Sequence, residues 1–175
     1  MKTVLIVEDE KLIRQGIKTM IQRSGVPVEV IIECNNGEMA LDVIREQKVD
    51  VMFTDIRMPK MDGIELVKQM QSCEHVPLTV AISGYDDFSY AVEMLRNGVR
   101  EYILKPVERE KITEILKKLN DEIEKEQEKR IEKKRLGHQQ MKHLMLLSNT
   151  TEEEIQTLER QYEKEFYDSG YAVLC

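Results

Sequence analysis

The sequence has few cysteines, no long apolar run and no excess of positive charge. Cys34, Cys73 and Cys175 are odd in number and widely spaced, without a CxxC pair, which argues against a disulfide framework and against a zinc site. No apolar run approaches the length of a membrane span, and strand-like residues follow directly after Met1-Lys2, so we expect neither a signal peptide nor a membrane anchor. These absences predict a cytoplasmic protein with reduced thiols.

The formal net charge of -7 argues against nucleic-acid binding by the chain as a whole, because phosphate contacts need clustered Lys and Arg. A local basic patch remains compatible with this balance. The hydrophobic content of 41% supports a true core, while the 34% charged content suggests a long solvated segment. A chain of 175 residues can form one full domain with an extension, or two small domains.

Short apolar runs alternate with stretches in which apolar residues recur at helical spacing. Such alternation, with connections of this length, requires parallel strands joined by right-handed crossovers. We therefore predict an α/β fold: a doubly wound, five-stranded parallel sheet that occupies about residues 1–120. The predicted strands are 3–7, 28–32, 51–55, 78–83 and 101–104, each followed by a helix.

Capping and turn residues predict where the helices begin. We expect Asp9 to be the N-cap of the first helix and Asp62-Gly63 to open the third. The fourth helix should carry Leu95 among its apolar positions, and the fifth should begin near Val107.

The fifth helix is predicted to continue beyond the sheet domain, as a charged linker helix over residues 121–147. Between Glu124 and Arg135 its only apolar side chain is Ile131, among alternating Glu, Lys and Arg. Charges of opposite sign three and four positions apart support an exposed helix. Two interpretations stay open: a solvated linker and a dimerising coiled coil.

Residues 148–175 are predicted to start a second α/β unit. Thr151 and Glu154 have the spacing of a capping box, so a helix should run to about Tyr167. Residues 171–175 have the composition of a strand that has no partner in this sequence. We therefore expect the chain to be a fragment, truncated within this second unit.

Polar residues follow four of the predicted strands. Because parallel strands present their carboxyl ends at one edge of the sheet, these residues should meet there. They are Glu8 and Asp9, Asp55, Ser83, and Lys105. Each has an ordinary explanation on its own, for example a favourable interaction of Glu8 and Asp9 with a helix N-terminus. Only their joint occurrence at strand ends indicates a site.

Three crowded carboxylates repel one another unless a cation neutralises them. A hard divalent ion such as Mg²⁺ suits oxygen ligands and retains several waters. With Lys105 as a further positive charge and Ser83 as a hydroxyl, the arrangement suits in-line transfer of a phosphoryl group. Asp55 would be the nucleophile that forms an acyl phosphate.

Five segments resemble the receiver domain of bacterial two-component response regulators, the CheY-like group of the flavodoxin-like doubly wound folds. They are residues 4–10 (VLIVEDE), 54–59 (TDIRMP), 61–63 (MDG), 81–84 (AISG) and 102–106 (YILKP). This resemblance implies a protein that receives a phosphoryl group from a sensor histidine kinase and is not an ordinary enzyme.

The resemblance also implies residue roles. Asp55 is the expected phosphoacceptor, Ser83 hydrogen-bonds the phosphoryl group and Lys105 pairs with it. Mg²⁺ is expected to bind Asp9 and Asp55 directly, Glu8 through water, and the backbone carbonyl of Arg57. Tyr102 is the expected switch residue that moves with Ser83, and the bond before Pro106 is expected to be cis.

Residues 83–88 (SGYDDF) and 97–102 (NGVREY) resemble the YesN-like subgroup, whose receivers precede an AraC-type DNA-binding domain. On this resemblance the chain ends before that domain and reaches DNA only through it. A homodimer is expected through the face of the fourth helix, fifth strand and fifth helix, or through the long helix.

Two other classes of protein share some of these features. A haloacid-dehalogenase-type enzyme also uses a strand-end Asp but needs an acid–base Asp two residues later, where this chain has Arg57. A stand-alone interaction module that never takes phosphate remains the alternative, and the complete acidic set argues against it.

Overall fold

A computed structural model describes residues 1–84 and 88–147. The predicted helix over 151–167 and the predicted strand over 171–175 lie outside these residues. The chain divides into two compact units, Met1–Glu124 and Lys125–Cys175. The predicted domain boundaries at residues 120 and 147 stay predictions.

The first unit contains a five-stranded sheet in which every neighbouring pair is parallel. Its order is β2-β1-β3-β4-β5. From β1 the chain first adds β2 on one side and then adds β3, β4 and β5 in turn on the other side. This is the predicted doubly wound arrangement. The strands are β1 Thr3–Val7, β2 Val30–Cys34, β3 Val51–Asp55, β4 Leu78–Ser83 and β5 Glu101–Leu104.

The central strands β1, β3 and β4 are mostly apolar because both of their faces are covered. Along β1, Val4 and Ile6 pack into one core cluster, and Leu5 and Val7 pack into the other. A strand places successive side chains on opposite faces, so a continuous apolar run is what a sheet buried on both sides requires. This alternation fixes the register and thereby the position of each strand end.

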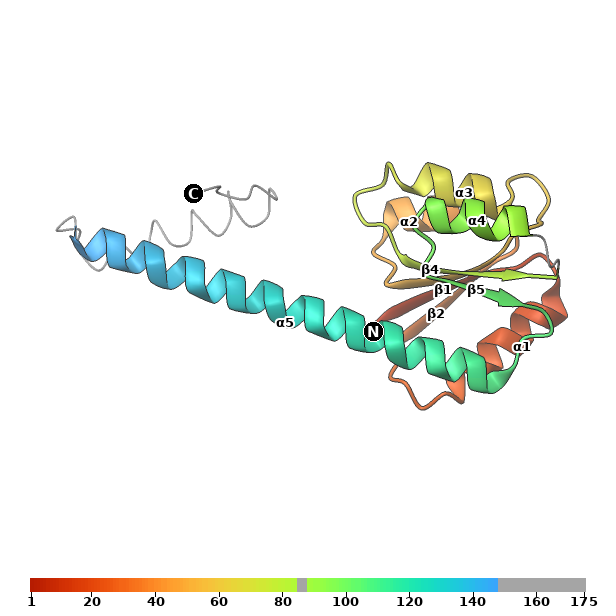
Figure 1. The fold of residues 1–175 in the computed structure, drawn as a ribbon, viewed down its shortest axis with the longest axis horizontal. Coiled ribbons are helices and arrows are strands. Elements are labelled where there is room, and N and C mark those ends of the chain that lie inside the picture. Colours follow the sequence, from red (N-terminus) through yellow and green to blue (C-terminus); the bar gives the residue numbers. More distant parts are fainter. Residues whose placement is uncertain (85–87, 148–175) are drawn as a thin grey trace. The chain divides into compact units, whose positions relative to one another are not determined.

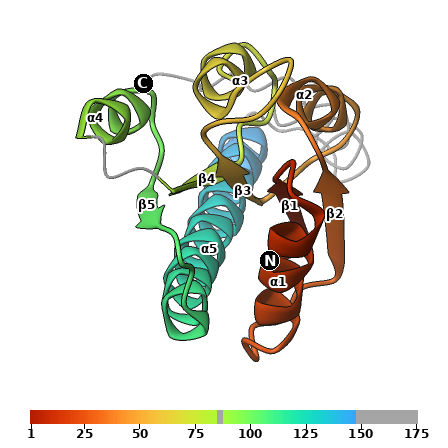
Figure 2. The same cartoon turned by 90° about the vertical axis from the view of Figure 1, so that its right-hand side faces the viewer.

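Helices cover the two faces of the sheet in layers (Figures 1 and 2). One layer consists of α1 and the first part of α5, and the other consists of α2, α3 and α4. The helices are α1 Lys11–Gln22, α2 Gly37–Glu46, α3 Gly63–Met70, α4 Phe88–Arg96 and α5 Arg109–Leu147.

Side-chain caps begin two helices. Asn36 accepts a hydrogen bond from the Met39 amide at 3.0 Å, and Asp62 accepts one from the Glu65 amide at 2.8 Å. The prediction that Asp9 caps α1 is wrong, because the N-cap is Glu10 and its side chain makes no capping hydrogen bond. The Asp9 carboxylate lies instead within the acidic group described below.

Three further expectations differ in detail. The buried apolar residue near the end of α4 is Met94, whereas Leu95 is 53% exposed, because successive helix positions point about 100° apart. The second strand lies two residues later than predicted, in register with β1 from Thr3 opposite Val30 to Val7 opposite Cys34. Helix α5 begins at Arg109 rather than near Val107.

The predicted long helix is present, since α5 continues to Leu147. From Glu124 to Arg135 its residues are exposed, and Ile131 is 67% exposed. This exposure fits both the solvated linker and a helix that pairs with a second copy. Among the helices that the structure describes, none has the length and apolarity needed to cross a membrane.

Gly63 provides a stability prediction, because it packs against the backbone of the strand that ends in Asp55. Its amide donates to the Ile56 carbonyl at 2.8 Å, and a Cβ at this position would lie 2.1 Å from the Asp55 carbonyl oxygen. We expect Gly63→Ala to lower the free energy of unfolding by about 2–3 kcal/mol, measured by urea denaturation.

Gly16→Ala is the matched control, since a Cβ there meets nothing within 4 Å in the middle of α1. We expect this variant to be more stable than the wild type by about 0.5–1 kcal/mol, because alanine favours helix. Equal effects of the two substitutions would contradict the close approach of α3 to β3.

Candidate functional site

The ends of β1 and β3 bring three carboxylates together at the carboxyl edge of the sheet. Glu8 and Asp9 follow β1 directly, and Asp55 is the last residue of β3. One ligand oxygen from each of the three lies within 4.8 Å of the other two. Glu8 is 1% exposed, whereas Asp9 is open to solvent, so the group has a buried side and an accessible side.

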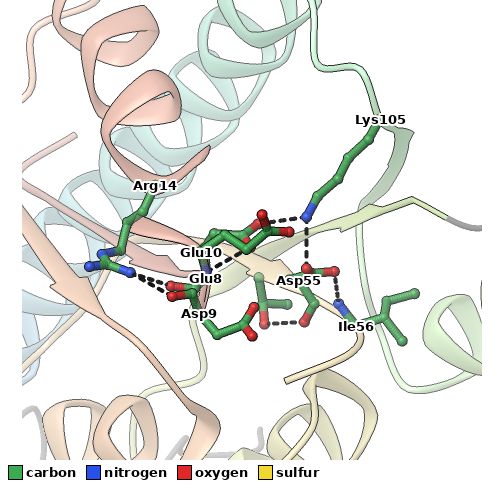
Figure 3. A network of polar contacts seen from close by, with 8 residues as sticks. Glu8, Asp9, Glu10, Arg14, Asp55, Ile56 and Lys105 are labelled. Carbon is green, nitrogen blue, oxygen red and sulfur yellow. Dashed lines mark hydrogen bonds and ion pairs between the residues drawn. The ribbon is translucent and has the colours of Figure 1, made fainter. Parts of the chain in front are cut away.

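Lys105 joins this group from β5. Its Nζ atom donates to Asp55 Oδ2 at 2.8 Å and to Glu8 Oε2 at 2.8 Å (Figure 3). The Lys105 amide also donates to the Ser83 carbonyl at 2.7 Å, and the Lys105–Pro106 peptide bond is cis. One ammonium group therefore connects the carboxylates that end two other strands.

The Asp55 carboxylate has a fixed orientation. Oδ1 accepts a hydrogen bond from the Ile56 amide at 2.6 Å, and Oδ2 accepts one from Lys105. The residue is buried, at the end of a fully buried strand. Donors thus hold both oxygens in place, which pre-organises the side chain for reaction at this edge.

The other predicted site residues lie around this network. Ser83 is buried at the end of β4, in the strand next to that of Asp55. Tyr102 on β5 is half-buried and packs against the core beneath α2, α3 and α4. The Arg57 side chain extends to α4, where its Nη2 atom donates to the Tyr90 hydroxyl at 2.9 Å and its Cζ atom lies 5.5 Å from the ring centroid.

The site carries an excess of negative charge. Burial raises the pKa of Glu8 from 4.5 to about 7; the Lys105 hydrogen bond opposes this rise and the charge on Asp55 adds to it. Burial disfavours the charge on Lys105, but its hydrogen bonds to Asp55 and Glu8 outweigh that effect, so its pKa lies above the ordinary value. One ammonium group does not balance three carboxylates.

This donor set fits a hard divalent cation. Carboxylate oxygens are the ligands that Mg²⁺ prefers, and it usually takes one or two from the protein and keeps several waters. Here the exposed Asp9 leaves room for waters, and a cation would stabilise the charged form of Glu8, which burial disfavours.

Two residues that contact the predicted site residues were not predicted from the sequence. Arg14 donates from Nη1 to the Glu8 carbonyl at 2.6 Å, and Tyr90 pairs with Arg57. A signal for Arg14 existed: helical side chains lean toward the N-terminus, so a basic residue one turn into α1 can reach the loop before it. Nothing in the spacing of Tyr90 indicates its contact across two elements.

A comparison with known protein families identifies the domain. The model described as "Response regulator receiver domain" matches residues 4–117. The chain belongs to the response regulator receiver family. Receiver domains are signalling modules rather than ordinary enzymes, bind Mg²⁺ through an acidic pocket, and are phosphorylated by histidine kinases in two-component systems.

Similar proteins agree with this assignment. The transcriptional regulatory protein YesN of Bacillus subtilis is 29% identical over 143 residues, which are 82% of this chain and 38% of YesN. The receiver domain of AraT, a response regulator from Geobacillus stearothermophilus, is 38% identical with a TM-score of 0.62, over 71% of this chain and 97% of that one.

A third similar protein is the response regulator TrrA from Thermotoga maritima, whose structure contains Mg²⁺ and a beryllofluoride group. It is 28% identical with a TM-score of 0.59, over 68% of this chain and 99% of that one. The receiver domain matches these solved domains along nearly their whole length. The chain spans half or less of the length of the curated relatives it matches.

The raised pKa of Glu8 predicts a pH dependence of stability. Between about pH 4.5 and 7 the folded protein retains a proton on Glu8 that the unfolded chain has released. Stability therefore falls as the pH rises through this window. We expect Glu8→Gln to remove this loss, so that the variant gains on the wild type by at most about 3 kcal/mol between the two ends of the window.

The measurement is urea denaturation of both proteins from pH 4.5 to 7.5 in buffer with EDTA, so that no divalent cation contributes. Glu29→Gln, at an exposed position, controls for the loss of one acidic group. A difference between Glu8→Gln and wild type that stays constant across this range would contradict the burial of the Glu8 carboxyl.

Proposed function

We propose that this receiver domain is a phosphorylation-gated switch in which Asp55 accepts a phosphoryl group from a sensor histidine kinase. The observation that carries the proposal is the Asp55 carboxylate, fixed by Lys105 and the Ile56 amide beside Glu8 and Asp9. An oxygen of Asp55 forms the new bond to phosphorus as the bond from phosphorus to the kinase histidine breaks, and the freed imidazole keeps its electron pair. The product is an acyl phosphate on Asp55.

The neighbouring residues have distinct roles in this step. Asp9, Asp55, Glu8 acting through water, and the Arg57 carbonyl would hold Mg²⁺, which supplies positive charge for the phosphoryl oxygens. Lys105 supplies a second positive charge on the other side, and the Ser83 hydroxyl donates a hydrogen bond to the transferred group. The pairing of β4 with β3 keeps Ser83, at the end of β4, next to the strand of Asp55.

Phosphorylation is then read out by the face of α4, β5 and α5. A new charged group at Asp55 draws Ser83 toward it, and Tyr102 moves into the space that this opens, which biases a two-state element. The exposed Leu95 on α4 and Leu104 on β5 make this face suitable for a homodimer contact. The long helix α5 provides a second surface for dimerisation.

The transcriptional output is proposed from the similarity to YesN, a transcriptional regulatory protein. A DNA-binding domain outside this sequence would act on the switch signal, consistent with a net charge of -7 that disfavours DNA contact by this chain itself. Such a protein would work in the cytoplasm. The alternative, an interaction module without phosphate control, predicts no Mg²⁺ binding, so a Mg²⁺ titration separates the two.

Phosphodonor labelling tests the acceptor. With radiolabelled acetyl phosphate and Mg²⁺, we expect the wild type to be labelled and Asp55→Asn to fall to background, because the amide is a poor nucleophile. Asp62→Asn is the matched control, since it makes the same change at an exposed helix cap and asparagine caps equally well. A label that survives in Asp55→Asn would refute the assignment.

Mass in solution tests the readout. We expect light scattering to give a larger mass with beryllofluoride and Mg²⁺ than with Mg²⁺ alone, because the mimic stabilises the switched state. The control is Asp55→Asn, whose mass should not respond to beryllofluoride. An unchanged wild-type mass would leave the acceptor chemistry intact and remove this route of signal transmission.

A further inference from the structure

Arg14 contacts the acidic residues through their backbone and not through their carboxylates. Its Nη1 atom donates to the Glu8 carbonyl oxygen at 2.6 Å and lies 3.4 Å from the Asp9 carbonyl oxygen. Figure 3 shows the guanidinium on one side of this dipeptide, with Asp55 and Lys105 on the other. The contact therefore leaves the carboxylate oxygens of Glu8 and Asp9 directed away from the arginine.

The carboxylate of Glu33 holds Arg14 in this position. Arg14 Nε lies 3.5 Å from Glu33 Oε2 on β2, and Glu33 also accepts hydrogen bonds from Lys18 and Gln15 on α1, both at 2.6 Å. The side chains of Arg14 and Glu33 are only 14% and 21% exposed. Contacts from two elements thus limit the positions that the guanidinium can take.

The backbone of Glu8 is tied to β2 at a second point. Its amide donates to the Cys34 carbonyl at 3.1 Å, directly after Glu33. The Glu8 amide is therefore held by β2 directly, and the Glu8 carbonyl is held by Arg14, which pairs with Glu33 on β2. This matters because the carboxylates of Glu8, Asp9 and Asp55 repel one another, and the β1–α1 junction carries that repulsion when they are charged.

We propose that Arg14 is a positioning residue for divalent-cation binding: it fixes the Glu8–Asp9 backbone so that both carboxylates face Asp55. The inference rests on the function proposed above, and it assigns to Arg14 a role in building the cation site without direct contact to the cation. Mutation of a group that orients metal ligands typically weakens metal binding by about 10–100-fold.

The sign of the effect separates positioning from simple electrostatics. A positive guanidinium near a cation site repels the cation, so its removal should strengthen Mg²⁺ binding if charge alone mattered. If Arg14 positions the ligands, its removal should weaken Mg²⁺ binding, because the junction relaxes under the repulsion of its carboxylates.

Isothermal titration of the full chain with Mg²⁺ alone measures this sign. We expect Arg14→Met to bind Mg²⁺ about tenfold more weakly than the wild type. Lys18→Met is the matched control: it removes one positive charge from the same helix and the same Glu33 partner without touching Glu8 or Asp9. We expect it to stay within about twofold of the wild type.

The rate of labelling by acetyl phosphate gives a second readout. In Arg14→Met the Mg²⁺ concentration for half-maximal labelling should rise by the same factor, while the maximal rate at saturating Mg²⁺ stays within about threefold of the wild type, because Arg14 does not contact Asp55. A general structural defect would lower the maximal rate, and thermal unfolding checks the fold directly. Glu33→Gln, which keeps Arg14 but weakens its anchor, should shift Mg²⁺ binding in the same direction by a smaller factor.

The outcomes are distinguishable. Unchanged or tighter Mg²⁺ binding in Arg14→Met, or an equal loss in Lys18→Met, overturns the positioning role and leaves the proposed function standing. If Arg14→Met does not fold, Arg14→Lys decides, because it keeps the positive charge and loses the guanidinium that contacts both Glu8 and Glu33: weaker Mg²⁺ binding supports the positioning role and unchanged binding overturns it. Absence of Mg²⁺ binding by the wild type overturns the role of Arg14 together with the cation-dependent function.

Discussion

Repulsion among carboxylates at one edge of the sheet is the constraint that the rest of this receiver domain accommodates. Glu8, Asp9 and Asp55 come from two neighbouring strands, and their oxygens lie within 4.8 Å of one another. Isolated buried charges of like sign are strongly unfavourable, so such a group persists only where partners offset it. The single ammonium of Lys105 offsets part of the charge, while burial, and to a smaller extent the charge on Asp55, raises the pKa of Glu8.

The surrounding fold holds these groups together from three directions. From β5, Lys105 bridges Glu8 and Asp55; from β2, Glu33 and Cys34 fix the β1–α1 junction through Arg14 and a backbone hydrogen bond. From α3, Gly63 packs against the carbonyl of Asp55 more closely than any other residue type would allow. The site is thus supported by regular elements, which position functional groups more accurately than loops alone.

The sequence predicts those parts of the structure that depend on local pattern. The apolar runs that end at Val7 and Asp55 identify buried parallel strands, and topology then brings Glu8, Asp9, Asp55 and Lys105 to one edge. Prediction from the sequence fails where a tertiary interaction competes with a local preference. Asp9 is a residue type that commonly caps helices, but its carboxylate lies in the acidic group. The contact of Arg14 with the Glu8 carbonyl follows from its place in the first turns of α1, but its pairing with Glu33 on β2 depends on the tertiary fold, which no local pattern encodes.

The bridge from Glu8 to Lys105 joins positions 97 residues apart, the first strand to the last. Closing so long a segment carries an entropic cost that only the assembled sheet can offset. A nascent chain that has not yet released β5 from the ribosome therefore has the acidic side chains but lacks the Lys105 bridge. The acidic group therefore gains its lysine only when the whole domain has been synthesised.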